Sequence, residues 1–168
     1  PGWANASNTP FRGYKHDPYE GGIGTPFIVS WPQGIPSKSN GKVVHDVSHL
    51  IDLMPTFVEA AGATYAEKYE GNDIHPMEGI SLIPTLTGGV LKRKAPLGFE
   101  HHGNLGLRAG KWKIVSMYRG NQARKWELYD MEADRTELND LAAKMPEKLK
   151  SMVEAWQSWA DRVGVQPW

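Results

Sequence analysis

The 168-residue chain has no cysteine. Disulfide bonds, thiolate zinc sites, iron–sulfur clusters and a cysteine nucleophile are therefore excluded within it. An excess of charge of one sign is missing too, because 19 Lys and Arg residues balance 19 Asp and Glu residues. A chain with zero net charge lacks the broad positive field of most nucleic-acid-binding proteins, so we expect no nucleic-acid partner.

Long hydrophobic runs are also lacking. Apolar stretches such as Phe27 to Val29 are far shorter than the roughly 20 residues that a membrane-spanning helix needs. We therefore expect no membrane partner. The chain opens at Pro1 without an apolar leader, and this start predicts that it is one piece of a longer protein.

Turn-forming residues, in contrast, are abundant, with 18 Gly and 12 Pro in the chain. They interrupt residues 1–24 so often that this segment is predicted to be an ordered loop. The mostly apolar run from Pro26 to Trp31 that follows predicts a strand buried on both faces, as in a parallel sheet.

Helical spacing marks three later segments. Apolar residues over 48–61 predict a helix that ends at Gly62, and Pro55 should kink this helix or displace its start. Residues 81–87 predict a short helical turn. From Pro146 to Val163 apolar side chains recur at steps of three and four, which predicts an amphipathic helix.

Between the second and third of these segments the pattern changes to short strand-like runs separated by turns, most of which contain Gly. These runs predict an antiparallel sheet of about four strands, one face of which the last helix should cover. The runs are Leu97–His101, Leu105–Ala109, Lys111–Tyr118 and Lys125–Tyr129.

The elements predict two unlike parts. Residues 1–89 are interpreted as the end of a larger α/β domain, because one buried strand and one helix cannot form a core by themselves. Residues 90–168 are predicted to form a small α+β subdomain. The apolar strand within residues 1–62 would offer open edges to other chains, so we expect that segment on its own to be unstable or to self-associate.

Six histidines raise the question of a metal site. His45 and His49 have the spacing of two zinc ligands on one helix face, but the helix is expected to begin only near position 48, and both are interpreted as capping and surface residues. On a strand, the adjacent His101 and His102 would point to opposite faces and could not easily share an ion. The other two histidines, in loops, are interpreted as ordinary polar residues: His16 and His75.

Other catalytic patterns are weak. The chain has no Gly-x-Ser-x-Gly motif for a serine nucleophile. The loop from Ser7 to Gly22 carries Lys15, whose ammonium is either an anion-binding group or a solvated surface charge. Gly21 next to Gly22 predicts a tight turn that lets the backbone approach another segment. Acidic residues before the last helix are interpreted as solvated turn-forming and capping groups: Glu132, Asp134, Glu137 and Asp140.

Several motifs follow one another along the whole chain: Asn5-Ala-Ser-Asn-Thr-Pro-Phe-Arg12 with Lys15, Glu20-Gly-Gly-Ile23, Trp31-Pro32, Asp52-Leu-Met-Pro-Thr56, Phe99-Glu-His101 with Gly103-Asn104, Gly110-Lys-Trp-Lys113, Trp126-Glu-Leu-Tyr-Asp130 and Thr136-Glu-Leu138. In this order they resemble the C-terminal part of the sulfatase family, arylsulfatase type. The resemblance implies an alkaline-phosphatase-like α/β fold, of which this chain holds the last part, followed by a C-terminal α+β subdomain with a four-stranded antiparallel sheet and a packed helix.

Sulfatases of this type hydrolyse sulfate esters, such as aryl sulfates or sulfated sugars, through a formylglycine nucleophile and a calcium ion. The formylglycine arises in a Cys/Ser-x-Pro-x-Arg motif, and Ser7 to Arg12 has one residue too many to be that motif. The resemblance therefore places the nucleophile and the calcium ligands upstream of Pro1. We expect no cofactor and no activity in this chain alone, and a periplasmic or secreted location for the complete enzyme.

One catalytic residue carries over from the family pattern, because Lys15 takes the place of the lysine that contacts the sulfate group. A fixed ammonium there would stabilise the negative charge that accumulates as the S–O bond breaks. Arg12 is instead predicted to be structural and to pair with a neighbouring carboxylate. His101 is a second candidate, for binding the substrate or protonating the departing alcohol.

Two other functions stay open at this point. A phosphonate or phosphate ester hydrolase of the same superfamily would resemble this chain in its tail. A non-catalytic carbohydrate-binding module would instead use exposed aromatic rings, such as those of Trp3, Tyr14 and Trp168, and would bind sugar without any upstream residue.

Overall fold

The computed structural model describes residues 2–167 and divides into two compact units. Of the described residues, 2–26 and 95–167 form the first, called the sheet unit below, and 27–94 form the second, called the connector unit. The domain division predicted at residues 89 and 90 concerns the complete protein and stays a prediction. Among residues 2–167, no helix combines the length and the apolar character that a membrane span requires.

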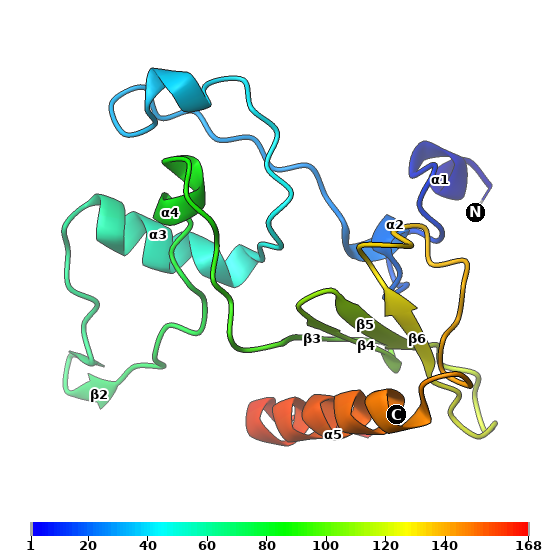
Figure 1. The fold of residues 1–168 in the computed structure, drawn as a ribbon. Helices are drawn as coiled ribbons and strands as arrows, with labels where there is room; N and C mark the ends of the chain where they lie inside the picture. Colours follow the sequence, from blue (N-terminus) through cyan, green and yellow to red (C-terminus); the bar gives the residue numbers. More distant parts are fainter. Residues whose placement is uncertain (1, 168) are drawn as a thin grey trace. The chain divides into compact units, whose positions relative to one another are not determined.

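The sheet unit is built on a four-stranded antiparallel sheet in the order β3-β4-β5-β6 (Figure 1). This arrangement confirms the predicted sheet, and the predicted C-terminal helix is confirmed at its exact bounds. The first hairpin turns within two residues, because His102 and Gly103 both have positive φ, as in a type I′ turn. The elements are β3 (Leu97–His101), β4 (Asn104–Ala109), β5 (Trp112–Ser116), β6 (Glu127–Asp130) and α5 (Pro146–Val163).

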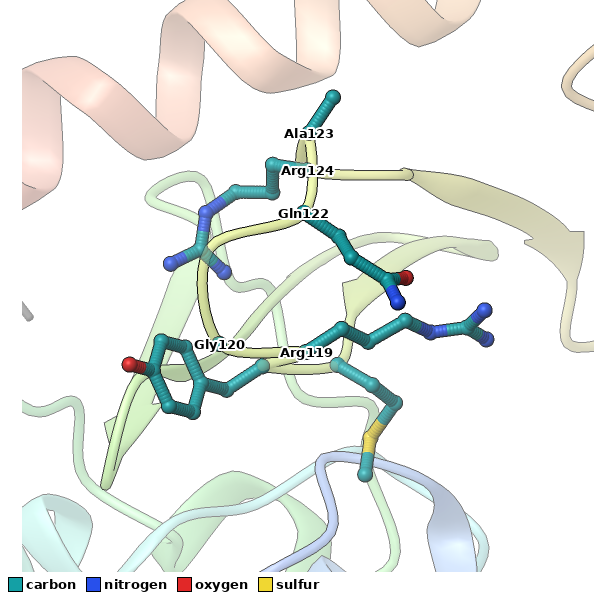
Figure 2. Close-up of a pocket in the computed structure, with 7 residues that line it drawn as sticks. Arg119, Gly120, Gln122, Ala123 and Arg124 are labelled. Carbon is teal, nitrogen blue, oxygen red and sulfur yellow. The ribbon is translucent and has the colours of Figure 1, made fainter.

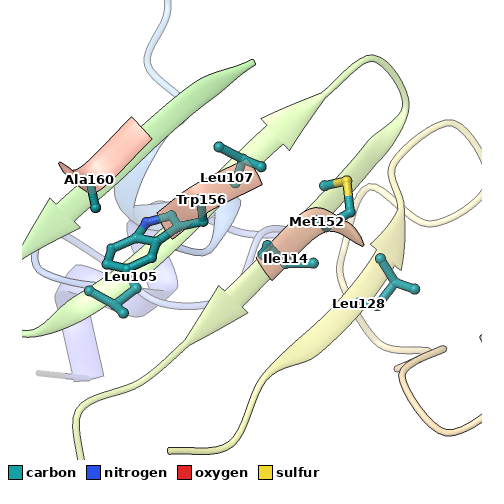
Figure 3. Packing of buried hydrophobic residues seen from close by; sticks show 7 residues of the cluster. All are labelled: Leu105, Leu107, Ile114, Leu128, Met152, Trp156 and Ala160. Atoms are coloured by element: carbon teal, nitrogen blue, oxygen red, sulfur yellow. The ribbon is translucent and has the colours of Figure 1, made fainter. Parts of the chain in front are cut away.

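Helix α5 covers one face of this sheet (Figure 3). Leu107, Ile114 and Leu128 of the sheet have no exposed surface, and they pack against Met152 and Trp156 of the helix. Complete burial of one such side chain stabilises a fold by about 1.5–3 kcal/mol. The contact between α5 and the sheet is therefore the main hydrophobic core of the unit.

Gly98 in β3 lies against the indole ring of Trp159, and a Cβ at position 98 would overlap that ring. We expect Gly98→Ala to lower the free energy of unfolding by about 1–3 kcal/mol, the usual effect of overpacking. Urea unfolding followed by circular dichroism would measure this loss. Gly2→Ala is the control, because a Cβ at Gly2 meets no atom within 4 Å. Equal stability of the two variants would contradict this packing.

The opposite face of the sheet is covered by the N-terminal segment of the same unit. Tyr19 is buried there with Val115, Tyr129 and Met131. The prediction that residues 1–24 contain no helix is wrong in part, since single turns fit between the closely spaced Gly and Pro residues. These short helices are α1 (Gly2–Ser7) and α2 (Glu20–Ile23).

The connector unit contains only short elements, and the buried strand predicted from Pro26 to Trp31 is wrong. No strand is assigned there, and Phe27 and Ile28 are 53% and 91% exposed. A strand needs a neighbour to pair with, and the two strands of this unit pair with each other. The elements are η1 (Ser37–Ser39), η2 (Leu50–Asp52), α3 (Leu53–Ala60), β1 (Lys68–Tyr69), β2 (Asn72–Asp73) and α4 (Ile83–Leu86).

The helix predicted over 48–61 forms as the 3-10 turn η2 followed by α3, which places Pro55 in the first turn of α3. The predicted displacement of the start by Pro55 is therefore confirmed, as is the capping role of His49, whose Nδ1 accepts from the amide of Ile51. The predicted apolar face is largely exposed, for instance at Phe57 (62%). Self-association of residues 1–62 stays a prediction.

Asp52 is the buried centre of the connector unit. Its carboxylate accepts hydrogen bonds from the amides of His49 (2.7 Å) and Ile80 (3.0 Å) and forms an ion pair with Arg93. Burial alone would raise the pKa of Asp52, but these partners outweigh burial and lower it. Asp52 therefore stays ionised and ties α3 to the segment that precedes α4.

Candidate functional site

The loop that carries Lys15 is closed at its base by two asparagine side chains. The Asn8 amide donates to the carbonyl oxygens of Gly13 (3.1 Å) and Gly21 (2.8 Å), and the Asn5 side chain accepts from the Gly13 amide (2.9 Å). A Cβ at Gly21 would lie only 2.6 Å from the Gly13 carbonyl oxygen. This confirms that the glycine pair at positions 21 and 22 permits a close backbone approach.

A buried ion triad, formed by Lys113, Glu20 and Glu137, fixes this loop to the sheet. The Lys113 ammonium lies 2.9 Å from Glu20 Oε1 and 2.8 Å from Glu137 Oε1. The Glu20 amide also donates to Glu137 Oε2 (2.7 Å). Lys113 and Glu137 have no exposed surface. Because Glu20 follows Lys15 by only five positions, the triad restricts where the loop can lie.

The electrostatics of the triad depend on its single ammonium. Burial raises the pKa of the Glu137 carboxyl, while the Lys113 charge and the Glu20 amide oppose that rise. The prediction that Glu137 is a solvated turn residue is wrong, because its side chain turns inward from a backbone with φ of 57°. A polar run before a helix gives no local sign of this burial.

Arg12 has the structural role that the sequence predicts, but with different partners. Its guanidinium donates to the backbone oxygen of Glu137 (2.8 Å) and to the Tyr129 hydroxyl (3.3 Å), and lies 4.1 Å from the centre of the Tyr19 ring. The predicted carboxylate partner is wrong, because the guanidinium binds a backbone oxygen, a hydroxyl and a ring instead.

Lys15 itself is exposed. It lies in the loop from Ser7 to Gly22, called the anchored loop below. Within residues 2–167 its ammonium has no ion-pair or hydrogen-bond partner, in contrast to Arg12 and Lys113. The charge at position 15 is therefore available to a ligand, and the proposed contact with a sulfate group stays a prediction.

His101 lies at the end of β3 and meets the loop one residue after Lys15. Its Nε2 is 2.8 Å from Nδ1 of His16, although 85 positions separate the two residues. The ring of His102 lies 4.3 Å from that of His101. The prediction that His101 and His102 point to opposite faces is wrong, because β3 ends at His101 and His102 belongs to the turn. The interpretation of His16 as an ordinary polar residue missed this cluster.

Two side chains, those of Asn104 and Arg124, hold the turn at the histidine cluster. The Asn104 amide donates to the backbone oxygen of His16 (3.0 Å), and its side-chain oxygen accepts from the Tyr118 amide (2.8 Å). Arg124 donates to the Gly103 carbonyl oxygen (2.9 Å). The loop and the turn are thus joined by the hydrogen bond from the Asn104 side chain to the His16 backbone as well as by their rings.

A pocket lies in the loop between β5 and β6, next to this turn (Figure 2). Figure 2 shows the guanidinium groups of Arg119 and Arg124 extending from opposite sides of the loop. Since Arg124 also binds Gly103, the pocket is linked to the histidine cluster. No catalytic or binding role is predicted from the sequence for its lining residues, which are Met117, Tyr118, Arg119, Gly120, Gln122, Ala123 and Arg124.

Comparison with known proteins identifies the fold around this loop. Residues 14–158 match the family described as N-sulphoglucosamine sulphohydrolase, C-terminal. This match includes Lys15 and His101 and extends nearly to the end of α5. The chain belongs to the sulfatase family.

Two curated relatives match most of this chain. An uncharacterised sulfatase of Schizosaccharomyces pombe is 30% identical over 98% of this chain and 30% of its own length, and arylsulfatase K of Xenopus laevis is 27% identical over 88% and 28%. The crystal structure of Ps i-CgsB in complex with k-i-k-neocarrahexaose has a TM-score of 0.71, with 25% identity over 90% of this chain and 32% of its own. The chain thus spans about a third or less of these relatives, and the alkaline-phosphatase-like fold is confirmed.

The sulfatase resemblance implies calcium, but the candidate ligand cluster found among the described residues does not fit that ion. Among the described residues, one group of three or more His, Asp or Glu side chains could hold a metal ion, namely His16, His101 and His102. Calcium prefers oxygen ligands, whereas these residues offer only imidazole nitrogen. No calcium site is therefore assigned to residues 2–167.

Proposed function

We propose that the complete sulfatase hydrolyses sulfate esters and that this chain supplies Lys15 to the sulfate-binding side of its active site. One observation carries the proposal: Lys15 is an exposed ammonium without a protein partner among the described residues, on a loop that a buried ion triad fixes to the sheet. The match over residues 14–158 supports the same reaction class.

The ammonium of Lys15 would act on the charge that the reaction creates. As the S–O bond breaks, negative charge grows on the bridging and sulfate oxygens, and a preorganised cation stabilises that charge without reorganisation. The formylglycine nucleophile and the calcium ligands are proposed to lie in the remainder of the protein. This chain has no cysteine, and its histidine cluster does not suit calcium.

A sulfated sugar is the substrate class that we favour. The matching family is described by a sulfated glucosamine, and the solved relative Ps i-CgsB holds a neocarrahexaose. We propose that His101, at the end of β3, hydrogen-bonds the substrate on its leaving-group side. His101 contacts His16, the residue that follows Lys15, and this proximity supports the assignment.

Turnover assays on the complete protein test the proposal. We expect hydrolysis of an N- or O-sulfated glucosamine oligosaccharide and of an aryl sulfate, with much slower hydrolysis of the matching phosphate and phosphonate esters. Faster turnover of the phosphorus esters would instead support the related hydrolase class and overturn the proposal.

A carbohydrate-binding module without catalysis is the remaining alternative. Of the three rings considered for it, Trp3 is 89% exposed, Tyr14 is half-buried and Trp168 lies outside the described residues. Calorimetric titration of this chain with the same oligosaccharide distinguishes the cases. Tight binding by the chain, with no sulfate release by the complete protein, would favour the module.

A further inference from the structure

Three imidazole rings from two distant segments meet at one edge of the sheet unit. His16 comes from the anchored loop, and His101 and His102 come from the end of β3 and the turn that follows. Their ligand nitrogens all lie within 4.8 Å of one another, and all three side chains are exposed. Three imidazoles with an open side are a donor set for zinc and similar divalent transition metals.

We propose that His16, His101 and His102 bind one divalent transition-metal ion of the zinc class, with a fourth position left to water. The site goes beyond the proposed sulfate hydrolysis and shares only His101 with it, because nitrogen donors suit an ion other than calcium. It would also engage His101, so an ion bound here would compete with substrate for that residue.

The distances between the rings are compatible with such an ion. Zinc–nitrogen bonds of about 2.0–2.1 Å in a tetrahedron place two ligand nitrogens roughly 3.3 Å apart. The 2.8 Å contact between His16 Nδ1 and His101 Nε2 would open slightly, and the widest separation would close by about 1.5 Å. We expect rotation of the exposed side chains to accommodate both changes. The proton of the present hydrogen bond moves to the other nitrogen of its ring, so none is lost.

The backbone around the cluster is held in the required shape without an ion. His16 and His102 have φ of 93° and 50°, a region that side-chain-bearing residues rarely adopt outside special sites. Asn104 ties the His16 backbone to the turn (3.0 Å), and Arg124 ties the turn to the β5–β6 loop through Gly103 (2.9 Å). Both contacts restrain the backbone that carries the three rings.

Titration of the full 168-residue chain with Zn²⁺ in metal-free buffer, followed by calorimetry, tests the proposal. We expect one ion per chain, and Co²⁺ in place of Zn²⁺ should give the intense visible absorption of a tetrahedral complex. We expect each of three single variants to weaken Zn²⁺ binding by at least about tenfold: His101→Ala, His16→Asn and His102→Asn. Even the loss of a residue that only supports a metal ligand typically weakens binding by about that factor. Asparagine is chosen at positions 16 and 102 because it tolerates positive φ.

His45→Ala is the matched control, because it removes an exposed histidine of the connector unit and leaves the cluster intact. We expect it to bind Zn²⁺ like the unaltered chain. Equal affinity in all four variants, or a Co²⁺ spectrum like that of the hydrated ion, would overturn the site. Because no substrate is present, this result does not depend on whether the complete protein hydrolyses sulfate esters.

Discussion

Lys15→Ala in the complete sulfatase should lower kcat by about 100- to 1000-fold, the effect of removing one preorganised donor from a charged transition state. The ammonium is exposed and has no partner within residues 2–167, so the thermal stability of the protein should not change. Steady-state kinetics with a sulfate ester, together with a thermal melt, would measure both quantities.

Two further variants make this result specific. Lys38→Ala removes an exposed lysine of η1 in the connector unit and should leave kcat unchanged. Lys15→Arg keeps the charge in a different shape and should retain part of the activity. An unaltered kcat in Lys15→Ala would show that the ammonium does not meet the reacting group.

Lys113→Met should lower the free energy of unfolding by about 3–5 kcal/mol, the range for removing one partner of a buried ion pair. The reason is that Glu20 and Glu137 would keep two largely buried carboxylates without their shared cation. Urea unfolding would report the loss, and replacing Glu137 by Gln in the same chain should recover part of it.

Lys111→Met is the matched control, at the turn residue that directly precedes β5 and two residues before Lys113. Lys111 pairs with Asp130 at 2.5 Å, but its side chain is 41% exposed, and surface pairs contribute little to stability. We therefore expect a much smaller loss than for Lys113→Met. Equal losses in the two variants would mean that the triad does not stabilise the fold.

The sheet unit was predictable because its signals are local. The apolar stripe of α5 and the alternation in the four strands each lie within one short segment, and both were confirmed by the contacts of Ile114 and Trp156. The strand expected at Phe27 is absent from the structure, because a strand depends on pairing partners that sequence spacing does not reveal. Within the described residues nothing pairs with it, and Ile28 is almost fully exposed.

The candidate site was predictable only where a motif marked it. Lys15 and His101 came from the family resemblance, and their roles stay predictions. His16 and Glu137 were missed because their partners are more than 20 positions away: His16 meets His101 across 85 positions, and the Glu20 amide reaches Glu137 across 117. A lysine in the middle of the apolar strand β5, Lys113, was the one signal that a buried carboxylate had to be near.

A crystal structure of the complete protein with a sulfate ester or inorganic sulfate bound tests the role of Lys15. We expect the Lys15 Nζ to lie at hydrogen-bond distance, about 2.7–3.2 Å, from an oxygen of the anion, on a loop still joined to Lys113 through Glu20. An anion bound elsewhere, with Lys15 directed into solvent, would contradict it.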